Sequence, residues 1–196
     1  MALSKGQLTR QKMINLMYLV FIAMLALNVS TEVLDGFVMI NDNIQESIVV
    51  TDERNKQIYA DIAASYETNR DKTQDSYNRA QSVKAKTDSI FDYLQYLKLE
   101  IAKKTDGADA DINNLKSKDN LDASSEVMIS PVGGQGKKLK KILDTYREAM
   151  VAQIPDESKR KIVSSTLSTE PSARAKKDHK DWITSSFDGM PSIAVL

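Results

Sequence analysis

An uncharged stretch from Met13 to Thr31 limits where this chain can reside. It contains 19 residues without a formal charge, and the part from Leu16 to Leu27 is almost entirely apolar. A helix rises about 1.5 Å per residue, so a helix over this stretch would be roughly 28 Å long, close to the thickness of the hydrocarbon core of a bilayer. We therefore expect a transmembrane helix over residues 13–31.

The charges on the two sides of this stretch predict its orientation. Lys5, Arg10 and Lys12 precede it, and Glu32 and Asp35 follow it. Cytoplasmic flanks of membrane helices carry an excess of lysine and arginine. We therefore expect residues 1–12 to be cytoplasmic and residues 32–196 to form a domain on the other side, in the periplasm of a Gram-negative cell. The localisation expected is the inner membrane, with a single crossing.

Two other interpretations of the stretch are weaker. A cleaved signal peptide usually has an apolar region of 7–15 residues that ends at a small-x-small site. Here the apolar region is longer, and the segment from Ala26 to Ser30 is a poor cleavage site. A buried core helix would need apolar surroundings, which the rest of the chain does not supply. A retained membrane anchor is the favoured interpretation.

The domain after the anchor is predicted to be all-α, with a long antiparallel helical hairpin. No proline occurs before Pro131, so long helices are permitted. One helix is expected from Glu32 to about Tyr66 and a second from Asp71 to Lys104, joined by a turn in which Asn69 is left-handed and Asp71 is the N-cap. Equal lengths and a short connection favour antiparallel packing. Residues repeat at intervals of seven in four rows: Ile44, Thr51, Ile58; Ile48, Asn55, Ile62; Val83, Ile90, Leu97; and Thr87, Leu94, Ile101.

Apolar density predicts where the hairpin has its core. It is high in residues 37–48 and 90–101, which an antiparallel hairpin places side by side at the membrane-proximal end. The tip, residues 54–85, is polar. Because two of the six positions in the seam of the first helix are polar, we favour a face that is only half buried over one in which they fix the register.

Shorter elements are expected in the rest of the domain. A third helix is predicted over residues 137–153, a short fourth helix opens at Pro155 with Ile162 on its buried side, and a last short helix over residues 181–187 turns Trp182, Ile183 and Phe187 inward. Pro191 opens a further apolar element near the end. We therefore expect the domain to be truncated at its C-terminal end, with the missing part available to cover the hairpin tip.

Few residues support catalysis or ligand binding. The net charge is zero, there is no cysteine, and His179 is the only histidine. The acidic group Asp106, Asp109 and Asp111 lacks the distal glutamate of a calcium loop. The segment Gly133–Lys138 lacks the first glycine and the hydroxyl of a phosphate-binding loop, so it is predicted to be a flexible turn. We expect no enzyme activity, no metal, no cofactor and no nucleic-acid partner.

Polar residues in and beside the anchor are the candidate site. Asn15 and Tyr18 are three positions apart and share a helix face. Polar groups in hydrocarbon are costly unless they are satisfied. Two interpretations are open: Arg10 and Lys12 extend to lipid headgroups while Tyr18 packs, or these groups pair with another membrane protein.

The segment from Leu8 to Asn28 resembles the start of GldM/PorM proteins, which are inner-membrane components of the type IX secretion and gliding motility machinery. Trp182, Phe187 and the segment from Pro191 to Val195 also resemble the family pattern before a further helix.

This resemblance implies a fold and a set of partners. It implies one transmembrane helix, a periplasmic helical bundle, and later β-rich domains that reach toward the outer membrane. It also implies that two such helices lie inside a ring of five GldL subunits and that the complex converts ion flow into torque. Arg10 corresponds to an arginine that pairs with an intramembrane glutamate of GldL, and Tyr18 matches a tyrosine of the family pattern.

The function hypothesis is therefore a membrane-embedded, dimeric motor component that drives secretion and gliding, with Arg10, Lys12, Asn15 and Tyr18 as the coupling residues. One alternative is a tethered periplasmic sensor or receptor, although such proteins usually have a second membrane helix. Another is a passive anchored scaffold, which would differ from the motor only in its indifference to the membrane potential.

Overall fold

The computed structural model describes residues 5–27 and 30–196, with side chains for residues 6–23 and 30–196. The regular secondary structure of these described residues is helical, with no strand among them, which confirms the all-α class. The elements are α1 (Lys5–Leu27), α2 (Thr31–Thr68), α3 (Arg70–Asp106), α4 (Ala123–Met128), α5 (Gly136–Ala152), α6 (Glu157–Thr166), α7 (Ala173–Lys177), α8 (Trp182–Phe187) and α9 (Ser192–Val195).

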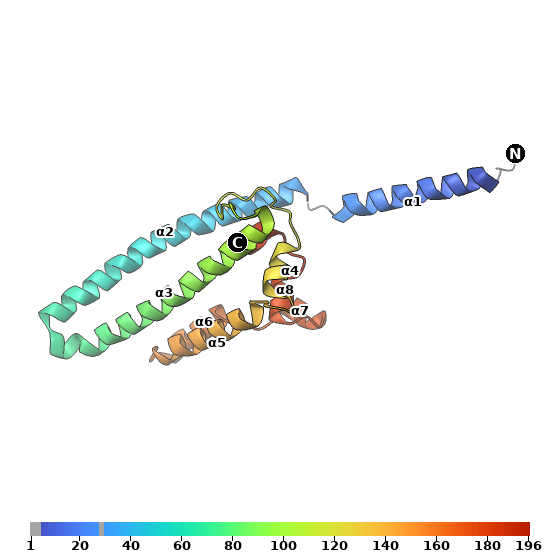
Figure 1. The fold of residues 1–196 in the computed structure, drawn as a ribbon. Helices are drawn as coiled ribbons and strands as arrows, with labels where there is room; N and C mark the ends of the chain where they lie inside the picture. The colour runs from blue at the N-terminus through green and yellow to red at the C-terminus, as the bar shows by residue number, and fades with distance from the viewer. Residues whose placement is uncertain (1–4, 28–29) are drawn as a thin grey trace.

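Helix α1 stands apart from the bundle (Figure 1). All its described side chains are exposed, including apolar ones on every side of the helix from Met13 to Ile22. Among the described residues, none of the helices is both long enough and apolar enough to qualify as a membrane span. The predicted span 13–31 includes residues 28 and 29, which lie outside the described residues.

Helices α2 and α3 form the predicted antiparallel hairpin (Figure 1). With 38 and 37 residues they are each about 55 Å long. Ser30 is the N-cap of α2, where its side-chain oxygen accepts a hydrogen bond from the Val33 N–H. The lengths and the pairing of the two helices therefore confirm the expectation from the sequence.

The turn at the tip differs from the prediction. Asn69 alone connects the helices, with φ −150° and ψ 78°, so it is not left-handed. It is the C-cap of α2 and the N-cap of α3, while Asp71 lies in the first turn of α3. Stacking of the Tyr66 and Tyr77 rings, with centroids 4.3 Å apart, joins the two helices close to this short connection.

The core lies at the end of the hairpin where α2 begins and α3 ends, which we call the base. Its buried cluster consists of Leu97 and Ile101 from α3, Met128 from α4 and Leu139 from α5. Partly buried side chains of α8 and α9 pack against it, among them Trp182 and Phe187. The prediction for α3 and for the inward side of α8 is therefore confirmed.

The prediction was wrong for α2, which has no buried residue. Ile44, Ile48 and Ile58 are 53%, 43% and 47% exposed, so the predicted seam is exposed rather than half buried, and Phe37 and Val38 are among the partly buried residues of α2 instead. The reason is geometric: α4 and α5 pack against α3, whereas the main helix contacts of α2 are with α3 and the short α9.

The shorter helices follow the sequence with two exceptions. Helices α5, α6 and α8 lie where they were expected, and the carboxylates of Asp156 and Asp181 cap α6 and α8 by accepting backbone N–H bonds. Helix α7 was not predicted. Ile162 is 64% exposed rather than buried; α6 packs mainly on α5 and has no buried residue.

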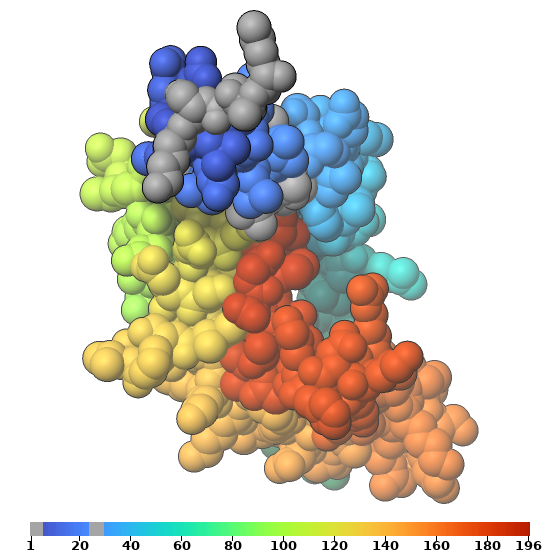
Figure 2. Space-filling view, turned by 90° about the vertical axis from the view of Figure 1, so that its right-hand side faces the viewer, coloured from blue at the N-terminus to red at the C-terminus, as the bar shows by residue number. Residues whose placement is uncertain are grey.

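Helix α9 packs at the base rather than at the tip. It contacts both α2 and α3. Viewed along the molecule from the α1 side, the red C-terminal segment lies between the yellow segment that contains α4 and the blue start of α2 (Figure 2). The last described residues thus close one end of the hairpin and leave the tip uncovered.

One strained residue ends α7. His179 has φ 54°, in the left-handed region, while the Lys180 N–H donates to the Ala175 carbonyl and the His179 N–H to the Lys176 carbonyl. This is the hydrogen-bond pattern of a helix end that favours glycine at the left-handed position. Replacing the exposed His179 with glycine is expected to raise the free energy of unfolding by about 1 kcal/mol. Urea unfolding would check this, and a lower stability would contradict it.

Candidate functional site

The four candidate residues lie on one continuous helix. Arg10, Lys12, Asn15 and Tyr18 are all within α1, and their side chains are exposed. Arg10 and Tyr18 are separated along the axis by about 12 Å. The helix therefore presents them at different depths of any membrane that it enters.

The helix does not place all four on one face. At about 100° per residue, Asn15 and Tyr18 are about 60° apart and Arg10 and Tyr18 about 80° apart. Arg10 and Lys12 are about 160° apart, on opposite sides of the helix. A single partner helix can contact Tyr18 together with Arg10 or Asn15, but Lys12 points away from a helix that contacts Arg10.

The electrostatics of this site are those of an uncompensated positive charge. Arg10 and Lys12 form no ion pair within the described part of the chain, and no acidic residue occurs in the sequence before Glu32. Asn15 does have a partner, since its side-chain oxygen accepts a hydrogen bond from Gln11 at 3.2 Å. Helix α1 itself supplies no carboxylate for Arg10.

A second polar cluster, which the sequence did not predict, ties α5 to the segment before α7. Thr169 is 2% exposed and donates to the Asp144 carboxylate at 2.6 Å while accepting from Lys140 at 2.8 Å. Arg147 also pairs with Asp144, at 2.9 Å. The hydrogen bond from Lys140, the bond from Thr169 and the charge of Arg147 hold the pKa of Asp144 below its usual value.

This cluster predicts a dependence of stability on pH. Because the pKa of Asp144 is lower in the folded than in the unfolded chain, its contribution is present above about pH 4 and is lost as the pH falls through the folded value. Replacing Asp144 with asparagine is expected to lower the free energy of unfolding by about 1–2 kcal/mol at pH 7, and by less below pH 4. Urea titrations at both pH values, with the exposed Glu148→Gln as control, would check this, and a deficit that is the same at both values would contradict it.

Two other acidic residues accept hydrogen bonds from backbone N–H groups of the loop after α3. Asp106 is partly desolvated, which raises its pKa, but bonds from the N–H groups of Lys116 and Ser117, at 2.6 and 2.9 Å, outweigh this and lower it overall. Asp111 accepts from the Asn113 N–H. These carboxylates thus stabilise the loop between α3 and α4. Among the described residues no group of three or more potential ligands converges on a metal position.

The glycine-rich segment is a packed turn rather than a flexible one. A Cβ at Gly134 would lie 2.5 Å from the Ser130 carbonyl oxygen. A Cβ at Gly136 would lie 2.5 Å from a methyl of Ile183 and 2.7 Å from the Met128 carbonyl oxygen. The absence of side chains at these positions lets α4, α5 and α8 approach one another, so the segment has a structural role.

The comparisons with known proteins concern the domain that follows α1. Residues 32–196 match a family model described as the GldM N-terminal domain. No curated protein matches the chain. The matched region begins just after the uncharged stretch, so the four residues of α1 lie ahead of it.

Proposed function

Because this chain belongs to the GldM family of gliding motility and type IX secretion components, we propose that it is the torque-bearing part of an inner-membrane motor. In this proposal α1 crosses the membrane and is driven by a surrounding partner, and the helical domain 32–196 transmits the motion in the periplasm. The observation that carries the proposal is the family match directly after an apolar helix that bears one arginine near its start.

The membrane anchor is supported by the surface of α1. Side chains from Met13 to Ile22 other than Asn15 are 41–71% exposed and include every side of the helix. A helix that is apolar all round needs an apolar environment, which a bilayer supplies. The uncharged stretch continues to Thr31. The basic residues before it favour a cytoplasmic N-terminus and a periplasmic C-terminal domain.

The coupling mechanism is supported by the isolation of Arg10. A guanidinium group in a membrane needs an anionic partner, and α1 offers none. We propose an intramembrane glutamate of a GldL-like subunit. When a passing ion neutralises that carboxylate, the pair is lost. Moving one charge through 100 mV supplies about 2.3 kcal/mol, which is comparable to a modest ion pair. The pair can therefore be broken and remade with each step.

The assembly proposed from the resemblance has two copies of this chain inside five GldL-like subunits. Two α1 helices then present two Arg10 side chains to five carboxylates, so the contacts cannot all be satisfied at once. Because the numbers differ, each arginine would pass from one carboxylate to the next in steps. Further domains would connect the motion to secretion components at the outer membrane.

Copurification from mild detergent tests the proposal. The chain is expected to bring down a small multi-span membrane protein that has a glutamate inside a membrane helix, and native mass spectrometry is expected to give five such subunits for two chains. A sensor or receptor would instead purify with a ligand in its helical domain. If the chain is recovered as a monomer without any such membrane partner, the motor proposal is overturned.

A further inference from the structure

A groove of about 450 Å³ lies between α3 and α5. Its volume is within the range of roughly 300–1,000 Å³ that is usual for small-molecule pockets. Thr87 on α3 is hydrogen bonded to Tyr146 on α5 at 2.9 Å. Further along α3, Tyr93 donates to Gln135, just before α5, at 3.2 Å. The two helices therefore run antiparallel, and these bonds hold the walls of this α3–α5 groove together.

The floor of the α3–α5 groove is apolar. Ile90 is 8% exposed, and Ile142 and Tyr146 are partly buried beside it. Ala85 and Ala149 line the end that points toward the tip, where their small side chains leave space above the floor. An alkyl chain in this space would be removed from water together with the floor, which is favourable in proportion to the apolar area buried.

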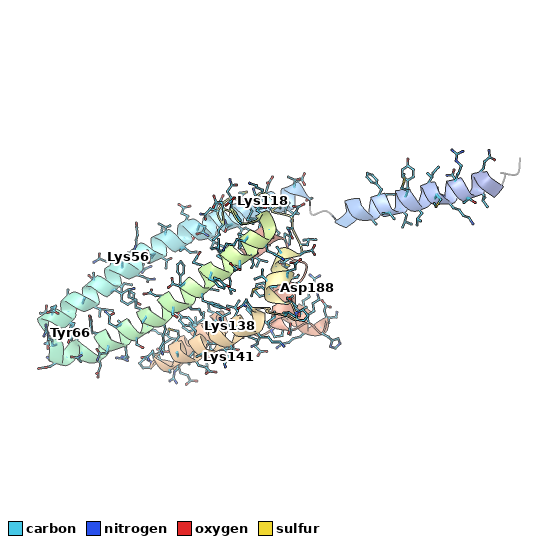
Figure 3. The ribbon with its side chains drawn as sticks, in the orientation of Figure 1. Lys56, Tyr66, Lys118, Lys138, Lys141 and Asp188 are labelled. Carbon is cyan, nitrogen blue, oxygen red and sulfur yellow. The ribbon has the colours of Figure 1, made fainter. Side chains whose placement is uncertain are left out.

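The rim of the α3–α5 groove is positively charged. Lys86 on α3 and Lys141 on α5 line it, and its lining contains no acidic residue. In Figure 3, Lys141 is labelled on α5. The neighbouring Lys84 and Lys140 each pair with a carboxylate on their own helix. Lys86 and Lys141 form no such pair within the part of the chain that the structure describes, so the rim offers two charges to an anion.

The two lysines are close enough to contact one ligand group. Lys86 is adjacent to Thr87, which contacts Tyr146. Lys141 precedes Tyr146 by five residues, which correspond to about 7.5 Å along a helix. Each ammonium group is at the end of a flexible four-carbon stem. Both can therefore reach a single anionic head between them, and the hydroxyl of Ser89 in the same lining is a further donor.

We propose that the α3–α5 groove binds an anionic amphiphile, which is a single alkyl chain with a carboxylate or phosphate head. The head contacts Lys86 and Lys141, and the chain lies over Ile90 toward Ala85. A neutral amphiphile would leave the two ammonium groups without a counter-charge, and a small anion alone would leave the floor in water. This site does not involve α1, so its test is independent of the motor proposal.

Protection of a cysteine in the groove tests the proposal, because the chain has no cysteine of its own. Ser89→Cys is made in the full chain, which is reconstituted in phosphatidylcholine nanodiscs and labelled with a biotin maleimide. Decanoate and decyl phosphate, compared at the same free concentration, are each expected to slow the labelling. A larger effect of decyl phosphate would identify a phosphate head, as in a phospholipid, and a larger effect of decanoate a fatty acid. The control is Val50→Cys, which is 62% exposed on α2, and its rate is expected to stay the same.

Two kinds of variant separate the head from the chain. In Ser89→Cys protein that also carries Lys86→Gln and Lys141→Gln, the apparent affinity for either amphiphile is expected to fall by about tenfold or more. Lys72→Gln removes an exposed charge from α3 outside the groove and is expected to leave the affinity unchanged. Ala85→Leu keeps both charges but fills the groove, so it is expected to abolish the protection.

Three results would each overturn the proposal. Decanol that protects Ser89→Cys as well as decanoate would show that the charge of the head has no role. Inorganic phosphate that protects it without an alkyl chain would show that the floor has no role. Equal slowing at Val50→Cys would show general adsorption to the chain. If the double lysine variant does not fold, as judged by circular dichroism, Lys141→Gln alone and Ala85→Leu supply the test, and unchanged protection in both contradicts the site.

Discussion

Replacing Arg10 with alanine is expected to stop gliding and type IX secretion while the protein and its membrane partner still assemble. The uncharged stretch and the rest of α1 remain intact in this variant, so insertion into the membrane is preserved. What disappears is the one charge that we propose to exchange carboxylate partners. Cell spreading, secretion of a reporter and copurification of the GldL-like partner, measured together, separate a coupling defect from an assembly defect.

A matched variant makes the test specific. Arg79→Ala removes the same group from an exposed position of α3, outside the proposed site, and is expected to leave motility unchanged. Arg10→Lys keeps a charge but loses the planar donor group, so it is expected to give weakened rather than absent motion. Normal gliding by cells that contain only Arg10→Ala would rule out the role assigned to this residue. A scaffold would likewise tolerate the change.

Truncating Leu97 to alanine is expected to cause a large loss of stability in the bundle. Leu97 is 3% exposed and lies in the cluster with Ile101, Met128 and Leu139. Removing a buried leucine side chain costs about 2–5 kcal/mol, because the cavity is only partly refilled. At about 2–4 °C per kcal/mol for a domain of this size, the melting temperature should fall by roughly 4–20 °C.

The control for this prediction is on the neighbouring long helix. Val50 is an apolar residue of α2 that is 62% exposed. Val50→Ala is therefore expected to change the free energy of unfolding by no more than about 0.5 kcal/mol. Thermal unfolding of both variants in the same detergent gives the comparison. Similar losses in the two variants would mean that α2 is buried in solution.

The hairpin could be predicted because its signals are local. Seven-residue repeats, the absence of proline before Pro131 and a polar turn near Asn69 each belong to one short segment. The conformation of Asn69 was mispredicted because stacking of Tyr66 on Tyr77 brings the helices closer than the turn residues alone imply. A contact between two helices leaves no periodic pattern in the sequence, so it could not be predicted from one.

The distribution of burial was harder to predict than the helices themselves. The apolar residues of α2 resemble those of α3, but only α3 lies between α2 on one side and α4 and α5 on the other. Ile162 was expected to be buried for the same reason, since an apolar residue indicates a face but not whether another helix covers it. The position of α9 between α2 and α3 likewise depends on hydrogen bonds from Ser192 to residues about 70–90 positions earlier.

The candidate site shows two different limits of sequence reasoning. Arg10 and Tyr18 were proposed from the resemblance to a family. The structure adds only that the two residues lie on nearby sides of α1. The cluster of Asp144, Lys140 and Thr169 was missed, because Thr169 lies 25 positions from its carboxylate and a single threonine has no recognisable spacing. A buried hydroxyl of this type is found only when the tertiary fold is known.

Concentrating the buried side chains at the base has a consequence for how the domain opens. Backbone amides of α3 near Leu97 can exchange with deuterium only when the whole bundle unfolds, whereas those near Tyr77 can exchange through local fraying of two exposed helices. The domain is therefore expected to be stiffer at the base, which follows α1, and more compliant at the tip. A torque applied at the base would be transmitted there with little deformation. Toward the tip, the same torque would bend the two long helices elastically.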